Sequence, residues 1–224
     1  MPSIKHILFD NDGTVVDSEI IAVRTMLRKL EPLGLRISER EYSRRFPGLR
    51  EREIVAILDQ EYGLALPGDF WPQVREEHIR LFESELQAIP GMFHLFTALK
   101  TKKSMVSNGS VQHVERCLRH VNLLHALDGH IFSAEQVERP KPHPDVFEYA
   151  MEQLRLQPED VVVVEDSPTG VQAAKRAGLK VIGFLAATHI IQEDHEETLR
   201  GLGADFIATD TPGLEKIFRQ LNIS

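Results

Sequence analysis

Cysteine is nearly absent from this sequence. Cys117 is its one cysteine, so an intrachain disulfide cannot form and a zinc site built from several cysteines is excluded. Long apolar runs are missing too. The first one, Ile7-Leu8-Phe9, ends at Asp10, far short of a secretory leader or of the roughly 20 residues of a membrane span. We therefore expect a protein of a reducing compartment, the cytoplasm, with no membrane partner.

An excess of positive charge is also lacking. The formal net charge is -8, and the basic residues are spread along the chain rather than gathered in one run. Such a chain repels a nucleic-acid backbone, so we expect no nucleic-acid partner. Internal repeats and low-complexity segments are absent from the sequence. With 224 residues, the chain can form one large domain, or a core domain that carries a smaller insertion. We expect a monomer or a weak dimer.

Short apolar runs that end at a polar residue predict five strands, at residues 4–9, 104–106, 131–132, 161–164 and 181–185. Helical spacing of apolar residues between the later strands predicts helices at 111–121, 144–154 and 169–177. Pro168 can begin the last helix, and Gly178 can end it. Alternating strands and helices indicate parallel pairing with helices on both faces. We predict an α/β fold whose core is a Rossmann-like, doubly wound parallel sheet.

The stretch between the first two predicted strands has a different pattern. It shows helical periodicity at 20–33, 51–62 and 70–86, and it ends at the turn signal Pro90-Gly91. Open α/β sheets bind ligands at the carboxyl ends of their strands, which is where this insertion begins. We therefore predict an inserted α-helical cap domain at residues 15–89, on a core of residues 1–14 and 90–224.

Two aspartates, Asp10 and Asp12, follow the first predicted strand in the segment DNDGT. Residues two apart in an extended chain point to the same side, so both carboxylates can share one pocket. Gly13 then permits a sharp turn. A calcium loop counted from Asp10 needs Gly at its sixth position and Glu at its twelfth, where this chain has Val15 and Ile21. The pair therefore indicates another kind of cation site, acid–base chemistry, or both.

The segment DNDGTVVDSE resembles the first motif of the haloacid-dehalogenase-like superfamily, and the remaining motifs follow in the family's order. Ser107 and Asn108 end a predicted strand, KPHPDVF begins at Lys141, and VVVVEDSPTG places Glu165 and Asp166 at another strand end. The resemblance covers essentially the whole chain. It implies a phosphatase of the helical-cap, β-phosphoglucomutase-like branch.

The resemblance also implies roles for the carboxylates. Asp10 would attack phosphorus to form an aspartyl-phosphate. With a reference pKa of about 3.9, its carboxylate is expected to be ionised at neutral pH and to need no base to activate it. Mg²⁺ would be held by Asp10, the backbone carbonyl of Asp12 and Asp166, with Glu165 beside it, in the oxygen-rich setting that Mg²⁺ prefers. Asp12 would protonate the leaving alkoxide and then deprotonate the attacking water.

Substrate contacts follow from the same resemblance. Ser107 and Lys141 match the family's phosphate-binding positions, where a hydroxyl donor and a positive charge hold the phosphate. Asn108, which adjoins Ser107, is predicted to bind the substrate as well. The segment RLFESELQAIPG resembles that of bacterial phosphatases acting on 6-phosphogluconate and similar sugar phosphates. We therefore expect a small phosphorylated metabolite as the substrate.

Gly48 and the two residues after it resemble the substrate-specificity loop of helical-capped members. Sugar-phosphate mutases of this group have a Gly-x-Ser-Arg pattern there, whereas this chain has Arg50 and Glu51 at the last two positions. The departure favours hydrolysis, with a mutase as the alternative. Arg50 is the candidate for contacting an anionic group of the substrate. Arg44 and Arg45 are further candidates, although arginines on a cap helix are usually solvated.

Two other hypotheses are open. The polar stretch that contains His189 and His195 has no metal-ligand spacing, so we predict an exposed helix end there. A non-catalytic binding protein on the same fold is an alternative, since fold alone does not establish function. A degenerate relative is expected to lose motif carboxylates or the motif lysine, and this chain keeps them all.

Overall fold

The computed structural model describes residues 4–46, 49–190 and 195–224, which form two compact units. One unit joins the N-terminal residues up to Asp17 to Gln87–Ser224, and the other unit is Ser18–Leu86. Among the described residues, no helix is both long and apolar enough to cross a membrane.

The first unit contains a six-stranded sheet in the order β3-β2-β1-β4-β5-β6, with every adjacent pair parallel. Its strands are β1 (His6–Phe9), β2 (Lys102–Ser107), β3 (Ile131–Ser133), β4 (Val161–Glu165), β5 (Lys180–Phe184) and β6 (Phe206–Ala208). The predicted α/β class with a doubly wound parallel sheet is confirmed. Strand order reverses between β1 and β4, and such a switch point is where open α/β sheets bind ligands.

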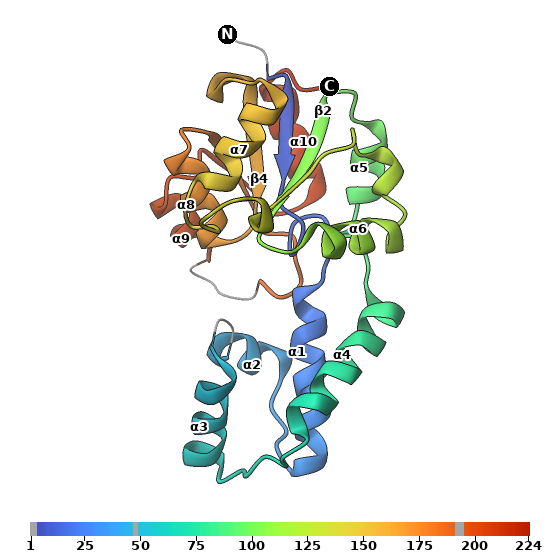
Figure 1. The fold of residues 1–224 in the computed structure, drawn as a ribbon, viewed down its shortest axis with the longest axis vertical. Coiled ribbons are helices and arrows are strands. Elements are labelled where there is room, and N and C mark those ends of the chain that lie inside the picture. The colour runs from blue at the N-terminus through green and yellow to red at the C-terminus, as the bar shows by residue number, and fades with distance from the viewer. Residues whose placement is uncertain (1–3, 47–48, 191–194) are drawn as a thin grey trace. The chain divides into compact units, whose positions relative to one another are not determined.

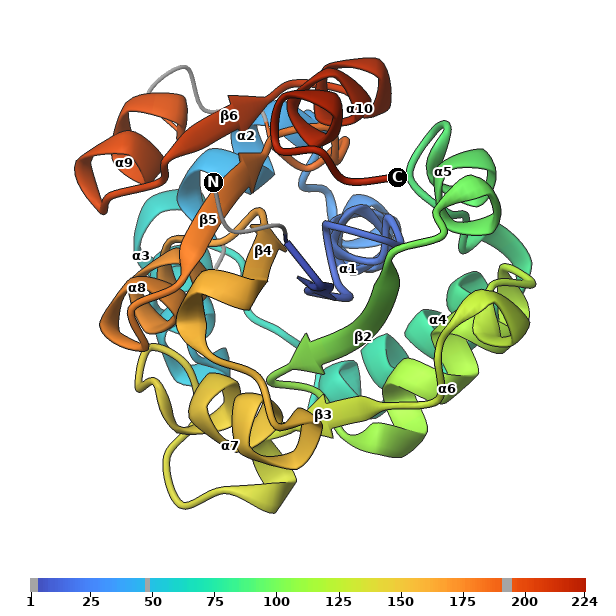
Figure 2. The ribbon, with the colours of Figure 1, turned by 90° about the horizontal axis from the view of Figure 1, so that it is seen from above.

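Helices cover both faces of this sheet (Figure 2). They are α5 (Met92–Ala98), α6 (Val111–His120), α7 (Asp145–Leu154), α8 (Pro168–Arg176), α9 (His195–Gly201) and α10 (Thr211–Gln220). Successive side chains of β1 point to opposite faces of the sheet, and their contacts show which helices cover each face. Leu8 joins the apolar cluster formed with α7, α8 and α9. Phe9 packs on the opposite side, 4.7 Å from the ring of Phe96 in α5 and 6.3 Å from the ring of Phe218 in α10. Burial on both faces holds β1, and therefore the residues after it, at the centre of the unit.

The second unit consists of α1 (Glu19–Leu30), α2 (Glu39–Arg45), α3 (Glu51–Tyr62) and α4 (Phe70–Glu85). Figure 1 shows α1 and α4 side by side, and Arg28 of α1 pairs with Glu85 of α4 at 2.7 Å. The three helices predicted in this stretch are present, and the short helix α2 is an addition. Whether the unit serves as a cap stays a prediction.

The chain leaves and re-enters the core unit through paired backbone. Asp17 N donates to Gln87 O at 2.9 Å, Ile89 N donates to Val15 O at 2.9 Å, and Val16 forms an antiparallel bridge with Ala88. Residues that are far apart in the sequence therefore form a closed stem, within the core unit, where the chain passes into and out of the helical insertion.

Candidate active site

The loop after β1 is fixed to the neighbouring strand and to Asp166. Asp10 N donates to Val164 O at 3.0 Å, which continues the pairing of β1 with β4 by one residue. Gly13 has a φ of 82°, and a Cβ built on it would lie 2.1 Å from Asp166 Oδ2. Glycine is therefore needed here both for the left-handed backbone and for the close approach of the carboxylate.

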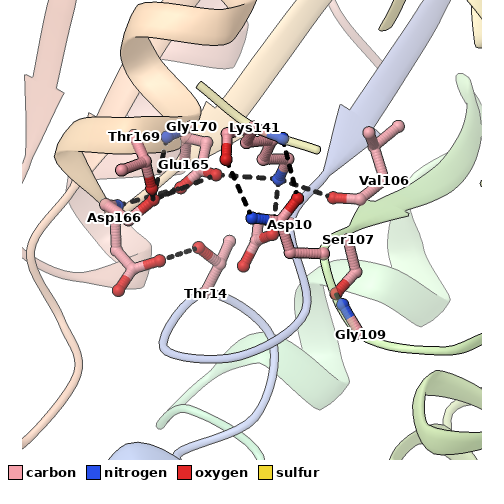
Figure 3. A network of polar contacts seen from close by, with 12 residues as sticks. Asp10, Thr14, Val106, Ser107, Gly109, Lys141, Glu165, Asp166, Thr169 and Gly170 are labelled. Atoms are coloured by element: carbon pink, nitrogen blue, oxygen red, sulfur yellow. Dashed lines mark hydrogen bonds and ion pairs between the residues drawn. The ribbon is translucent and has the colours of Figure 1, made fainter. Parts of the chain in front are cut away.

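Lys141 is the centre of the site (Figure 3). Its Nζ donates to Asp10 Oδ1 at 2.7 Å, to Glu165 Oε1 at 2.9 Å and to Val106 O at 2.8 Å. The side chain is 2% exposed. An ammonium has three protons, and all three have acceptors here. Burial lowers the pKa of Lys141, but the attraction of Asp10 and Glu165 outweighs it and raises the pKa above its ordinary value.

Ser107 and Asn108 lie at the end of β2, next to the lysine. Asn108 donates from Nδ2 to Lys141 O at 3.2 Å and accepts from Lys141 N at 2.9 Å, so its amide fixes the lysine backbone. Ser107 is buried, and its Oγ accepts from Gly109 N at 2.9 Å. The structure brings both residues to the site, and their contacts with a substrate stay predictions.

Glu165 ends β4 and Asp166 follows it, and each carboxylate accepts a hydrogen bond from a neighbouring segment. Glu165 Oε2 accepts from Ser167 N at 2.9 Å, and a Cβ on Gly170 of α8 would lie 1.5 Å from Glu165 Oε1. Asp166 Oδ1 accepts from Thr14 Oγ1 at 2.9 Å. The first turn of α8 and the loop after β1 therefore fix the two acidic side chains.

The prediction of an exposed helix end at His189 and His195 is wrong. His195 does begin α9, but its Nε2 donates to Asp166 O at 2.7 Å and its side chain is half-buried. His189 lies with its Nε2 3.6 Å from Asp166 Oδ2, and burial lowers its pKa to about 4. Both histidines pack around Asp166 because the segment after β5 folds back over the end of β4.

Three buried carboxylates can hold a cation. Asp10, Glu165 and Asp166 each offer an oxygen, and the three oxygens lie within 4.8 Å of one another. An all-oxygen donor set suits a hard divalent cation such as Mg²⁺. One lysine faces these three acids, so two negative charges would remain unbalanced if all were ionised. The residues present therefore fit a divalent cation.

The buried environment of Asp10 changes the expectation that this carboxylate is ionised at neutral pH. Burial raises the pKa of Asp10 well above its ordinary range, and repulsion from Glu165 adds to the shift, while Lys141 opposes it. The expectation of an ionised Asp10 used the pKa of an exposed carboxylate. In this buried setting, a divalent cation beside Asp10 would favour the charged form.

Asp12 has a partner that the sequence motifs do not include. His113 of α6 lies with its Nε2 3.0 Å from Asp12 Oδ1 and 3.5 Å from Cys117 Sγ. Hydrogen bonding to Asp12, and then to Cys117, raises the pKa of His113 to about 10. No sequence motif connects His113 with Asp12, because the two residues lie 101 positions apart in the chain. The spacing of His113 and Cys117, four residues apart on a helix, was the one clue.

The arginine candidates belong to the helical unit. Arg50 is exposed and precedes α3, where its backbone N donates to Glu53 Oε2 at 2.7 Å. Arg45 pairs with Glu61 and donates to the hydroxyl of Tyr62, so its guanidinium already has partners within this unit. Arg44 is exposed. Gly48 lies outside the described residues.

Comparison with known proteins decides the family. The model of the haloacid dehalogenase-like hydrolases matches residues 7–184. The chain belongs to this family. Among curated hydrolases of the kind, it is 34% identical to the 6-phosphogluconate phosphatase of Escherichia coli, with 84% of this chain and 86% of the relative covered. It is 33% identical to a phosphorylated carbohydrates phosphatase of Thermotoga maritima, with 80% and 84% covered.

Solved structures of haloacid dehalogenase-like proteins have the same fold. A hydrolase from Deinococcus radiodurans with bound phosphate and sodium matches with a TM-score of 0.91 at 28% identity, covering 99% of this chain and 98% of that one. A putative β-phosphoglucomutase from Thermotoga maritima matches with a TM-score of 0.79 at 27% identity, covering 96% and 99%. The chain is also 31% identical to hexitol phosphatase A of Escherichia coli, with 81% of this chain and 83% of the relative covered.

Proposed function

We propose that this chain is a magnesium-dependent phosphatase that hydrolyses a small phosphomonoester through an aspartyl-phosphate on Asp10. The observation that carries the proposal is the position of Asp10. Its buried carboxylate lies at the switch point of the sheet, 2.7 Å from Lys141 and within one acidic cluster with Glu165 and Asp166. Curated relatives with phosphatase names support the reaction class.

Each residue has a role in this proposal. Asp10 attacks phosphorus, and its bond to the phosphoryl group forms as the bond to the leaving oxygen breaks. Lys141 balances charge on Asp10 and the phosphate, while Ser107 donates a hydrogen bond to a phosphate oxygen. Asp12 gives a proton to the leaving alkoxide and later takes one from the water that hydrolyses the aspartyl-phosphate. Bound Mg²⁺, held by Asp10, Asp166 and the Asp12 carbonyl with Glu165 beside it, would neutralise phosphate charge.

A substitution at the nucleophile tests the mechanism. Asp10→Asn keeps the size of the side chain but removes the attacking anion, so turnover of sugar phosphates should fall by at least about a thousandfold while the protein stays folded. Asp166→Asn should instead raise the Mg²⁺ concentration needed for activity. Excess chelator should abolish wild-type turnover, and added Mg²⁺ should restore it. Asp10→Asn activity within tenfold of wild type, or full activity in chelator, would exclude this mechanism.

We propose a sugar phosphate or a sugar-acid phosphate, such as 6-phosphogluconate, as the substrate. The names of the relatives support this class. The helical unit is proposed as the cap, and Arg50 as its contact with the carboxylate of a sugar acid.

Losing a charged hydrogen bond costs about 1.5–3 kcal/mol, or roughly ten- to a hundredfold in catalytic efficiency. Arg50→Ala should therefore impair 6-phosphogluconate hydrolysis by that factor and para-nitrophenyl phosphate hydrolysis hardly at all. Equal effects on both substrates would remove Arg50 from the proposal.

A mutase is the second candidate, because a putative β-phosphoglucomutase has the same fold. Release of inorganic phosphate separates the two reactions. A phosphatase releases one phosphate per substrate consumed, whereas a mutase needs a bisphosphate primer and returns an isomeric sugar phosphate. Parallel assays of phosphate and of the sugar phosphate product, with and without the primer, decide between them.

A further inference from the structure

A second group of side chains that could hold a metal ion includes Asp12, two residues after Asp10, and its chemistry differs from that of the carboxylate cluster. Asp12, His113 and Cys117 each offer one ligand atom, and the three atoms lie within 4.8 Å of one another. The first cluster offers oxygen alone, whereas this one offers oxygen, nitrogen and sulfur. His113 and Cys117 have no role in the mechanism proposed above.

The two neighbours of His113 converge on one ring nitrogen. Asp12 Oδ1 lies 3.0 Å from Nε2, and Cys117 Sγ lies 3.5 Å from the same atom. A ring nitrogen has either one proton or one lone pair, so a single proton must be shared between these two groups. A metal ion at this point could instead be bound by all three ligands. Tetrahedral zinc, with bonds of about 2.0–2.3 Å, places its ligand atoms roughly 3.3–3.7 Å apart. The two separations at Nε2 are therefore close to those of a tetrahedral site, while the Asp12 and Cys117 atoms, which lie within 4.8 Å of each other, must approach the same range when an ion binds.

The local structure supports ligation by all three residues. His113 and Cys117 are one turn apart on α6, which places both side chains on one face of the helix. The Cys117 side chain is buried, whereas those of Asp12 and His113 are 24% and 30% exposed. An ion from solvent can therefore reach Asp12 and His113 first, and the buried thiol of Cys117 is then available as the third ligand. Solvent on the open side can supply a fourth ligand.

We propose that a borderline-soft divalent cation, of which Zn²⁺ is the test case, binds Asp12 Oδ1, His113 Nε2 and Cys117 Sγ and thereby inhibits the enzyme. The ion displaces the protons on Nε2 and Sγ, which pass to solvent, and no electrons are transferred. Its inhibitory effect rests on the proposed function, because it removes the Asp12 carboxylate from proton transfer. Its binding does not rest on that function.

The two clusters share no side-chain ligand, and this has a kinetic consequence. Zn²⁺ in the mixed cluster leaves the carboxylates of Asp10, Glu165 and Asp166 available to Mg²⁺. Inhibition by Zn²⁺ should therefore persist at saturating Mg²⁺. Zinc that displaced magnesium from the oxygen cluster would instead be overcome by more Mg²⁺.

Cobalt provides a direct measurement of the ligands. Titration of the full chain with CoCl₂, in excess MgCl₂, should give one bound ion with a sulfur-to-cobalt charge-transfer band in the near ultraviolet, which ZnCl₂ should then abolish. Cys117→Ala should lose the band, and the matched control Asp166→Asn should keep it. A folded wild-type protein that binds cobalt without this band, or does not bind it, overturns the proposal whatever the variants do.

Inhibition is measured on the same proteins. The ZnCl₂ concentration for half-inhibition at saturating MgCl₂ should rise at least about tenfold in Cys117→Ala, with each protein compared with its own zinc-free rate. An unchanged value, or relief of wild-type inhibition by tenfold more MgCl₂, overturns the proposed inhibition. If the chain shows the cobalt band but hydrolyses no phosphate ester, the proposed function fails and the metal site stands. If the chain hydrolyses phosphate esters but shows no cobalt band, the proposed metal site fails and the proposed function stands.

Discussion

At the scale of single residues, the site depends on one buried lysine shared by two acids. Lys141 replaces water as the partner of Asp10 and Glu165, both of which are almost fully buried. Removing one partner from a buried ion pair leaves an uncompensated charge, which typically costs about 3–5 kcal/mol. The lysine is therefore expected to stabilise the fold as well as to bind phosphate.

Lys141→Met tests this double role. The substitution keeps most of the side-chain volume but leaves two carboxylates without their cation. We expect activity to be lost and the free energy of unfolding to fall by about 3–5 kcal/mol at neutral pH. The pKa of Asp10 is already raised by burial, so acid can neutralise this group in the variant. The stability difference from wild type, measured by urea unfolding, should therefore be smaller at about pH 5 than at about pH 8. A constant difference would contradict this explanation.

Residues also show what the sequence could and could not predict. Asp10, Lys141, Glu165 and Asp166 were singled out because each belongs to a short contiguous motif, at a strand end for the three acids and before α7 for Lys141. His113 and His195 were missed because their contacts join distant segments, to Asp12 and Asp166, with no local pattern to reveal them. The pKa of Asp10 could not be predicted either, since burial is a property of the folded chain.

At the scale of elements, predictions succeeded where apolar periodicity or a terminal signal was strong. The helix α3 has the predicted bounds, and α8 begins at Pro168 as expected. The strand β6 has three residues at the sheet edge, two of them only partly buried, so its apolar pattern is weak. The helix α10 was missed although Asp210 caps it, accepting from Gly213 N at 2.7 Å. Asp210 followed by Pro212 is a sequence pattern typical of a helix start, so this helix was predictable in principle.

The start of α8 gives a prediction at this scale. Gly170 allows the helix to approach Glu165, whose side chain is also held by Lys141. Gly170→Ala should force α8 or Glu165 to move and should lower the free energy of unfolding by about 1–3 kcal/mol, with a loss of activity. Gly201→Ala is the matched control. A Cβ at this second helical glycine meets nothing within 4 Å, so the change should be neutral or stabilising by up to about 1 kcal/mol. If the two variants had equal thermal stabilities, the Glu165 side chain would be able to move away from the added methyl group without a loss of stability, which would contradict this prediction.

At the scale of the whole molecule, stability should depend on pH through a histidine remote from the proposed chemistry. His6 is buried in β1, and its Nε2 lies 2.8 Å from Ser104 Oγ. Burial lowers the pKa of His6 from 6.5 to about 4. Between these values the unfolded chain binds the proton and the folded chain does not, so the free energy of unfolding falls as the pH is lowered. The contribution is fully present above about pH 6.5, and about 3 kcal/mol is lost by pH 4.

A double variant isolates this contribution. Replacing both partners, as His6→Val with Ser104→Ala, removes the titrating group without leaving a buried hydroxyl unpaired. Urea unfolding of this variant from pH 7 to pH 4 should show a shallower loss of stability than wild type. The comparison is needed because burial also lowers the pKa of His189, which contributes in the same direction. Identical pH slopes would mean that His6 is protonated without cost.

The closed stem at Val15–Asp17 and Gln87–Ile89 makes the helical insertion an exchangeable module. Because the backbone pairing is complete on the core side, β1 and β2 can keep their places whatever chain runs between Asp17 and Gln87. A lineage could therefore lengthen, replace or graft this insertion without rebuilding the sheet that holds the carboxylates. With the insertion acting as the proposed cap, evolution of substrate choice and inheritance of phosphoryl chemistry would proceed separately, in two parts of one gene.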